Sequence, residues 1–145
     1  MPEQTGTRAG VDDVRALLTA TRTWAVVGCS PDAARDSHRI GQLPQREGFR
    51  VIPVNPAVEG ELLGERCYPS LDAIPPGEAV EVVDVFRRSD QAGVHVDEAI
   101  ALGVTGVWLQ LGVIDGAAAA RARAAGLRVV MDRCPAIELP RLRRG

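Results

Sequence analysis

The turn at residues 26–38, VVGCSPDAARDSH, combines residue types that can bind an anion. Two valines lead into Gly28, which allows a tight turn, and Ser30 adds a hydroxyl beside backbone N–H groups. A helix that begins near Arg35 would present its positive end to the same space. A dinucleotide fingerprint would have glycines where this chain has Ser30 and Ala33. The turn therefore predicts phosphate binding without the usual dinucleotide motif.

The end of the second predicted strand, PVNP at residues 53–56, offers no carboxylate. Proteins that bind NAD hold the ribose diol with an Asp or Glu about 20 residues after the glycines. This chain has Val54, Asn55 and Pro56 at that place, which disfavours NAD. The two prolines fix an extended backbone. PVNP is either a rigid rim for a flat base or a chain-like ligand, or a simple strand end, and both interpretations stay open.

Two pairs of arginines are expected near the turn. Arg35 and Arg39 begin the helix after it, and Arg87 and Arg88 follow the strand that ends near Phe86. Because the carboxyl ends of parallel strands share one edge of a sheet, both pairs can reach the same crevice. Guanidinium groups bind phosphate oxygens through paired N–H donors. We expect Arg35 and one of Arg87 and Arg88 to form a positive phosphate pocket.

Motifs for catalysis or metal binding are lacking in the sequence. It contains no Ser/His/Asp order, no HExxH and no P-loop. His95 is expected in mid-helix, whereas His38 could donate a hydrogen bond to a ligand. Cys29, Cys67 and Cys134 are widely spaced without a CxxC motif, so we expect reduced thiols and no zinc site. The sequence favours a binding protein and leaves catalysis open.

Apolar, β-favouring runs alternate with helix-like segments along the chain. Strands are expected at residues 23–27, 49–54, 79–86, 104–111 and 127–131, and helices at 12–21, 35–47, 89–102 and 115–125. Gly48, Gly103 and Gly126 precede strands, where a left-handed glycine can end the previous helix. Ser89 and Asp115 are expected to be N-caps. This pattern predicts a three-layer α/β fold, with helices on both faces of one parallel sheet.

Three segments depart from this alternation. Pro44 should kink or shorten the helix that contains it. Residues 58–76 carry irregularly placed glycines and prolines, which predicts a long connection in place of a helix. Residues 1–11 are polar and glycine-containing, so we expect a flexible N-terminus followed by a single domain at residues 12–145.

The composition excludes several classes of protein. The 145 residues include 46% hydrophobic and 25% charged residues, which is typical of a globular domain with its own core. A net charge of −2 argues against a protein that coats nucleic acid. No apolar run approaches the roughly 18 residues that a membrane span needs. We expect a cytoplasmic protein that binds neither nucleic acid nor membranes.

The sequence resembles the small stand-alone CoA-binding-domain family, which is related to the N-terminal CoA-binding domain of the succinyl-CoA synthetase alpha subunit. The resemblance rests on the segments WAVVGCSPDAARDSHRI, GFRVIPVNP, GERCYPSL, VDVFRRSD, VWLQLGV and GLRVVMDRCP. Their order and spacing cover nearly all of residues 12–142. The resemblance implies a Rossmann-like sheet that holds coenzyme A or an acyl-CoA.

The family pattern also implies which residues contact the coenzyme. Those expected to hold phosphate groups are Gly28, Ser30 and Arg35, with Ser37 nearby. Those expected to line the side of the nucleotide are Val54, Asn55 and Pro56. Those expected to border the adenine and ribose-phosphate region are Phe86, Arg87 and Arg88. Those expected toward the pantetheine path are Gln110 and Gly112.

The chemistry of coenzyme A agrees with these residues. Its 3′-phosphate and diphosphate demand more cationic contacts than NAD, and it has no free 3′-hydroxyl to pair with a carboxylate. We expect a non-catalytic or regulatory CoA-binding protein, either a monomer or a homodimer. An NAD(P)-binding redox enzyme or sensor, with arginines on a 2′-phosphate, stays an alternative. So does a CoA-binding subunit of a larger acyl-CoA ligase, although the sequence has neither the phosphohistidine segment nor the ATP-grasp partner of the ligases.

Overall fold

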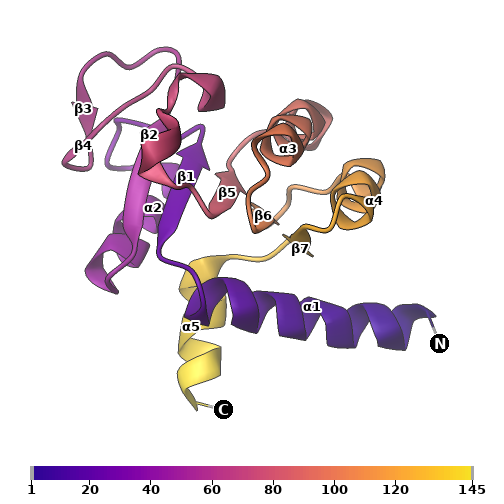
Figure 1. The fold of residues 1–145 in the computed structure, drawn as a ribbon. Helices are drawn as coiled ribbons and strands as arrows, with labels where there is room; N and C mark the ends of the chain where they lie inside the picture. The colour runs from indigo at the N-terminus through magenta and orange to yellow at the C-terminus, as the bar shows by residue number, and fades with distance from the viewer. Residues whose placement is uncertain (1, 145) are drawn as a thin grey trace.

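The main sheet is built from the apolar, β-favouring runs of the sequence (Figure 1). The computed structural model describes residues 2–144. The sheet has five parallel strands in the order β2-β1-β5-β6-β7. The strands are β1 (Thr23–Val27), β2 (Arg50–Val54), β5 (Val82–Val85), β6 (Gly106–Leu109) and β7 (Arg128–Val130). Each of them lies within a predicted strand, and all but β1 are shorter than predicted.

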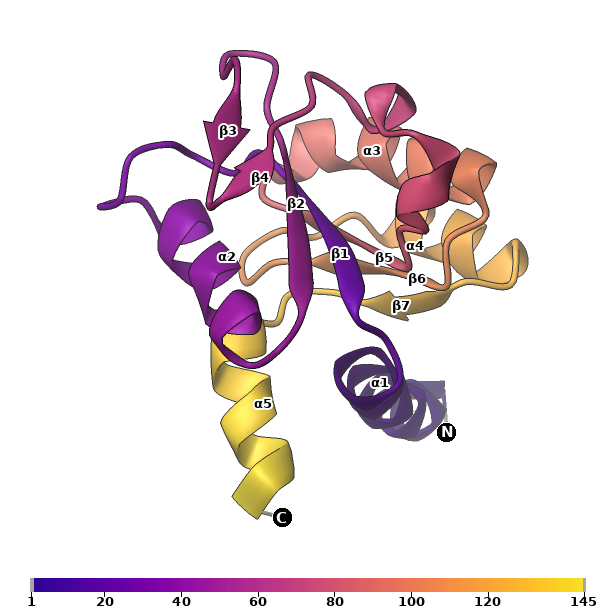
Figure 2. The same cartoon turned by 60° about the vertical axis from the view of Figure 1, so that its left-hand side comes forward.

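Helices cover both faces of this sheet, which confirms the predicted α/β fold (Figure 2). One face carries α3 (Ser89–Leu102) and α4 (Gly116–Ala124). The other carries α1 (Pro2–Thr19), α2 (Asp36–Arg46) and α5 (Pro135–Arg144). Among the described residues, none of the helices is long and apolar enough to cross a bilayer.

Two tryptophans organise the core beneath α1 and α5. The rings of Trp24 on β1 and Trp108 on β6 have centroids 5.5 Å apart, and both side chains are fully buried. Each indole N–H has an acceptor, because Nε1 of Trp24 donates to Oγ1 of Thr21 at 2.8 Å and Nε1 of Trp108 donates to the carbonyl of Arg133 at 2.8 Å. The two indole rings therefore bury a large apolar area while both of their N–H groups keep a hydrogen-bond acceptor.

Small residues bring α3 and α4 close to the opposite face. Their buried side chains are mainly alanines: Ala92, Ala99, Ala118, Ala119 and Ala122, together with Val96. These pack on the valines and leucines of β1, β5 and β6 that point to this face. The predicted end of α3 is confirmed, since Gly103 has φ 71° and its N–H donates to carbonyls of the last turn.

The helix ends differ from the predictions at several places. The helix expected from Asp12 begins at Pro2, and α5 was not predicted. The division into a flexible segment at residues 1–11 and a domain at 12–145 stays a prediction. Pro44 lies in the last turn of α2, which ends at Arg46. The helix continues for two residues past Pro44, and Gly48, with φ 96°, follows its end.

The connection between β2 and β5 contains no α-helix, as the glycines and prolines of residues 58–76 predict. It contains β3 (Glu61–Leu62) and β4 (Glu65–Arg66), which form an antiparallel hairpin. Two short 3₁₀ helices follow at Leu71–Ala73 and Pro76–Glu78. The structure is therefore more regular here than the irregular connection that was predicted.

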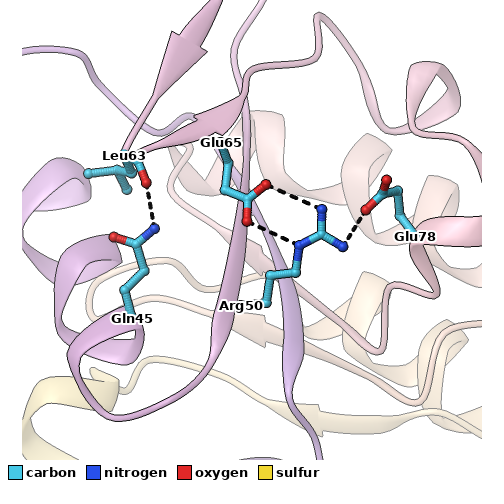
Figure 3. Close-up of polar contacts among 5 residues, drawn as sticks. All are labelled: Gln45, Arg50, Leu63, Glu65 and Glu78. Atoms are coloured by element: carbon cyan, nitrogen blue, oxygen red, sulfur yellow. Dashed lines mark hydrogen bonds and ion pairs between the residues drawn. The ribbon is translucent and has the colours of Figure 1, made fainter.

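Polar contacts attach this connection to α2 and to the amino end of β2 (Figure 3). Nε2 of Gln45 donates to the carbonyl of Leu63 at 2.7 Å. The guanidinium of Arg50 binds both carboxylate oxygens of Glu65, at 3.1 and 3.2 Å, and also pairs with Glu78. Arg50 is the first residue of β2, so these contacts stabilise the sheet at the amino ends of its strands, away from their carboxyl ends.

Candidate functional site

The order of the main sheet reverses between β1 and β5. The chain leaves β1 toward α2 on one face, and leaves β5 toward α3 on the other, so the two exits diverge at the carboxyl ends of neighbouring strands. Ligands of open α/β sheets bind at such a point. A cavity of about 690 Å³ lies there, which we call the switch-point cavity. Its volume is within the range of about 300–1,000 Å³ found for small-molecule sites.

Gly28 shapes the floor of this cavity because it ends β1 next to the end of β5. Its φ is 85°, and a Cβ atom at this position would lie 2.3 Å from the carbonyl oxygen of Phe86. The N–H of Gly28 donates to the carbonyl of Val54, and the N–H of Phe86 donates to that of Val27, both at 2.9 Å. The turn is therefore fixed between β2 and β5, and no other residue type fits there without strain.

Side chains from α2 and from the end of β2 hold the turn that follows Gly28. Oγ of Ser37 accepts from the N–H of Ser30 at 3.0 Å, and Nδ1 of His38 lies 2.9 Å from the carbonyl of Ser30. Nδ2 of Asn55 donates to the carbonyl of Cys29 at 2.9 Å. These bonds place the turn beside the amino end of α2, where the helix dipole favours an anion.

Three arginines from two segments of the chain line the switch-point cavity. Arg35 precedes α2, while Arg87 and Arg88 follow β5, and all three line the cavity. The predicted convergence of the two arginine pairs thus holds for these three. Arg39 lies outside the lining and pairs with Asp36, which reduces the negative charge that Asp36 adds to the cavity. Arg88 pairs with Asp90 at 3.4 Å, so Arg35 and Arg87 are the lining arginines for which the structure describes no ion pair within residues 2–144.

Beneath the cavity lies a buried polar pair. Asp84, in the middle strand β5, is 1% exposed, and Gln110, just after β6, is 3% exposed. Nε2 of Gln110 donates to Oδ1 of Asp84 at 2.5 Å. Burial raises the pKa of Asp84 to about 7, although the bond from Gln110 opposes this increase.

The cysteine thiols near the cavity are held in their protonated form. Burial raises the pKa of Cys29 to about 12, and its proximity to the ionisable groups of Cys67 and Asp84 acts in the same direction. Burial also raises the pKa of Cys134, which lines the cavity. Because the thiolate is the nucleophile, these thiols are poorly reactive at neutral pH.

Most of the predicted contact residues surround the switch-point cavity. Those that line it are Gly28, Ser30, Arg35, Ser37, Asn55, Phe86, Arg87, Arg88 and Gln110. Val54, Pro56 and Gly112 do not line it. The side chain of Val54 is buried in the core toward α3, and the N–H of Gly112 donates to Oδ1 of Asp132 at 2.7 Å. The contacts of all these residues with a ligand stay predictions.

Sequence reasoning missed several residues that also line the cavity. These are Ala34, Asp36, Ile40, Leu111, Val113 and Cys134. Helical spacing could have found Ile40, because it lies one turn after Asp36 and Ser37 on the same face of α2. Cys134 could have been found from its place just after β7, since the strand ends share one edge.

The loop between β6 and α4 is held on two sides at the rim of the cavity. Oγ of Ser89 donates to the carbonyl of Gly112 at 3.3 Å and accepts from the N–H of Ile114 at 2.9 Å. Asp132 binds the same loop through Gly112. The prediction that Ser89 is the N-cap of α3 is therefore wrong, because Arg88 occupies that position and Ser89 binds the loop. Asp115 is an N-cap as predicted, since its side chain accepts from the N–H of Ala118.

A parallel sheet with helices on both faces and an arginine-lined cavity at its switch point defines a Rossmann-like α/β domain. Within that class, the family model described as "CoA binding domain" matches residues 22–140. The chain therefore belongs to the CoA-binding domain family, and the resemblance seen in the sequence is confirmed.

Individual relatives agree with this assignment. YneT, an uncharacterized protein of Bacillus subtilis (strain 168), is 32% identical over 122 residues, which cover 84% of this chain and 88% of YneT. A hypothetical protein from Pyrococcus horikoshii OT3 has a TM-score of 0.84 and 37% identity, with 91% of each chain covered. The apo form of acetyl-coenzyme A synthetase 1 from Ca. Korarchaeum cryptofilum has a TM-score of 0.66 and 25% identity. That match covers 82% of this chain but only 28% of the synthetase.

Proposed function

We propose that this protein binds coenzyme A, or an acyl-CoA, in the switch-point cavity and acts as a non-catalytic or regulatory CoA-binding protein. The observation that carries the proposal is the convergence of Arg35, Arg87 and Arg88 on the same cavity as the turn after Gly28. Several cations in one cavity suit a ligand with a diphosphate and a further phosphate. Membership of the CoA-binding domain family supports the same ligand.

The end of β2 favours coenzyme A over NAD. Asn55 lines the cavity where NAD-binding proteins have a carboxylate. Both ends of its amide are engaged within the protein, because Nδ2 donates to Cys29 and Oδ1 accepts from the N–H of Ala57 at 2.9 Å. Asp36 also lines the cavity, but it belongs to the start of α2 and pairs with Arg39. The end of β2 therefore offers no carboxylate to a ribose diol.

The polar groups around the cavity support binding more than catalysis. Ser37 and His38 hold the backbone of the turn at Ser30, because Oγ of Ser37 accepts from its N–H and Nδ1 of His38 lies beside its carbonyl. The thiol of Cys134 has a raised pKa, which disfavours a role as a nucleophile. These residues form a rigid cradle for a phosphorylated ligand.

Calorimetric titration of the protein with coenzyme A and with dephospho-CoA tests the proposal. We expect one binding site per chain and weaker binding of dephospho-CoA, because it lacks the 3′-phosphate. Equal affinity for the two ligands would remove the proposed contact with that phosphate. Absence of binding to coenzyme A, together with binding of NADPH, would replace the proposal with the NADP alternative.

A second candidate function is that of a CoA-binding subunit in a larger acyl-CoA ligase. The similarity to a part of acetyl-coenzyme A synthetase 1 favours it, since the matched part makes up 28% of that chain. Affinity purification of the tagged protein from its own cells would recover an ATP-binding partner chain if this candidate is right. Recovery of the protein without such a chain would count against it.

A further inference from the structure

Asp84 occupies a position where the fold by itself favours an apolar residue. It lies in β5, the middle strand of the sheet, next to Val83 and Val85, and all four residues of this strand are buried. Its side chain points to the face that also carries Trp108, its neighbour on β6. Burial of a carboxyl group in such surroundings costs free energy unless the group is paired.

The structure gives Asp84 an amide partner in place of a cation. Within residues 2–144, the ion pairs that the structure describes do not include Asp84, although the protein has many arginines. Its side-chain partner is Nε2 of Gln110, at 2.5 Å. A carboxyl group that is retained in the core without a countercharge suggests a role beyond folding.

Gln110 connects this buried carboxyl with the ligand site. It lines the switch-point cavity while its Nε2 is bound to Asp84. The carbonyl oxygen Oε1 is therefore the end of the amide that can accept a hydrogen bond from a bound molecule. Asp84 is thus placed to decide which end of the Gln110 amide the cavity presents.

We propose that Asp84 is a positioning residue whose protonation inverts the Gln110 amide, and so determines whether the cavity offers a hydrogen-bond acceptor or a donor. The ionised carboxylate only accepts, so it holds Nε2 and leaves Oε1 for a donor of the ligand. The protonated carboxyl can donate to Oε1, which turns the NH₂ group toward the cavity. This inference rests on the proposed function, with an N–H group of coenzyme A as the donor that Oε1 accepts.

The groups around Asp84 determine when this change occurs. Cys29, which follows β1, and Cys134, which precedes α5, both lie within electrostatic range of Asp84. Asp36 at the start of α2 acts on Cys134 as well. Both thiols are protonated near neutral pH because burial raises their pKa values, so Asp84 is the group of this cluster that titrates around pH 7. Arg35, Arg87 and Arg88 are the cationic residues that line the cavity next to this cluster.

The side-chain amide of Gln110 reports this change directly in the ligand-free protein. Its ¹⁵N–¹H NMR signals can be assigned by their loss in Gln110→Ala. We expect them to shift with pH between 5.5 and 8.5 in the wild type, and not in Asp84→Asn, whose neutral amide does not titrate. Signals that stay constant in the wild type, or that titrate equally in Asp84→Asn, would overturn the proposal.

Binding of coenzyme A tests the consequence for the ligand. The dissociation constants of the wild type and Asp84→Asn should be measured at pH 6 and pH 8, because their ratio cancels the titration of the ligand phosphates. We expect the dissociation constant of Asp84→Asn, divided by that of the wild type, to increase about threefold or more from pH 6 to pH 8. A ratio that does not change with pH would contradict a role of Asp84 in binding.

A further variant separates failure of this inference from failure of the proposed function. Gln110→Ala keeps Asp84 but removes the amide, so the ratio of its dissociation constant to that of the wild type should show the same dependence on pH. This comparison also applies if Asp84→Asn does not fold. If coenzyme A does not bind at any pH, the proposed function fails, while the NMR titration still decides whether Asp84 controls the amide.

Discussion

A Cβ atom at Gly28 would lie 2.3 Å from the carbonyl oxygen of Phe86. This close approach brings the ends of β1 and β5 together, and it places the turn after Gly28 beside Arg87 and Arg88. The need for glycine at this position is therefore explained by the backbone of the neighbouring strand. A glycine-rich dinucleotide motif is not required for it.

Gly28→Ala is expected to destabilise the protein by at least about 2 kcal/mol, because it combines a left-handed φ with a backbone clash. Urea unfolding followed by the fluorescence of the two buried tryptophans measures the change. Gly116→Ala is a suitable control, since nothing lies within 4 Å of a Cβ there and alanine favours the helix. Similar effects of the two substitutions would contradict the close approach.

Arg35→Ala is expected to weaken the binding of coenzyme A by roughly 1.5–3 kcal/mol, the scale of a charge-assisted hydrogen bond. Arg46→Ala is the matched control, because Arg46 is exposed in the last turn of α2 and does not line the cavity. Calorimetry measures both variants. If both substitutions weaken the binding of coenzyme A equally, Arg35 contributes only through the net charge of the protein and not through a direct contact.

Asp84 makes the stability of the protein depend on pH in a direction opposite to that of most carboxylates. Its pKa is about 7 in the folded state and near 3.8 otherwise, so the folded state binds the proton more tightly. The tighter binding of this proton stabilises the folded state. Its contribution to the free energy of unfolding is complete below about pH 4 and is lost as the pH rises to 7. Relative to Asp84→Asn, the wild type should lose roughly 3 kcal/mol between pH 4.5 and 7.5.

Urea unfolding of both proteins at the two pH values measures this difference. A wild type and Asp84→Asn that respond equally to pH would show that Asp84 has an ordinary pKa in the folded protein.

The buried thiols should react slowly in the folded protein. Cys29, Cys67 and Cys134 are free and buried, and burial raises the pKa of each. Reaction with DTNB at pH 8 should therefore be slow, and should become fast and complete in urea. Bound coenzyme A should slow the reaction of Cys134 further, because this residue lines the cavity. Rapid reaction of the native protein would contradict the described burial.

Local sequence patterns predicted most of the main sheet because its strands are short apolar runs between glycines and polar turns. The junction at Gly103 is an example, since the glycine ends α3 just before β6. The same reasoning missed α5, in which Pro135 and Pro140 obscure the helical pattern. Its apolar residues, such as Leu139, pack with α1 only after the chain has folded.

The candidate site was predicted less completely because its contacts join distant segments. The arginines and the turn follow strands, so the rule for parallel sheets places them at one edge. Ser89 illustrates the limit, because its type suits an N-cap while its hydroxyl binds the loop at Gly112 and Ile114. The pairing of Asp84 with Gln110 joins residues 26 positions apart, and no local pattern indicates it.

Backbone amide shifts mapped during a titration with coenzyme A would locate the bound ligand on the chain. We expect the largest shifts at residues 28–37, at Arg87 and Arg88, and around Gln110. Shifts confined to the opposite edge of the sheet, around Arg22, Phe49 and Arg143, or no shifts at all, would contradict this expectation.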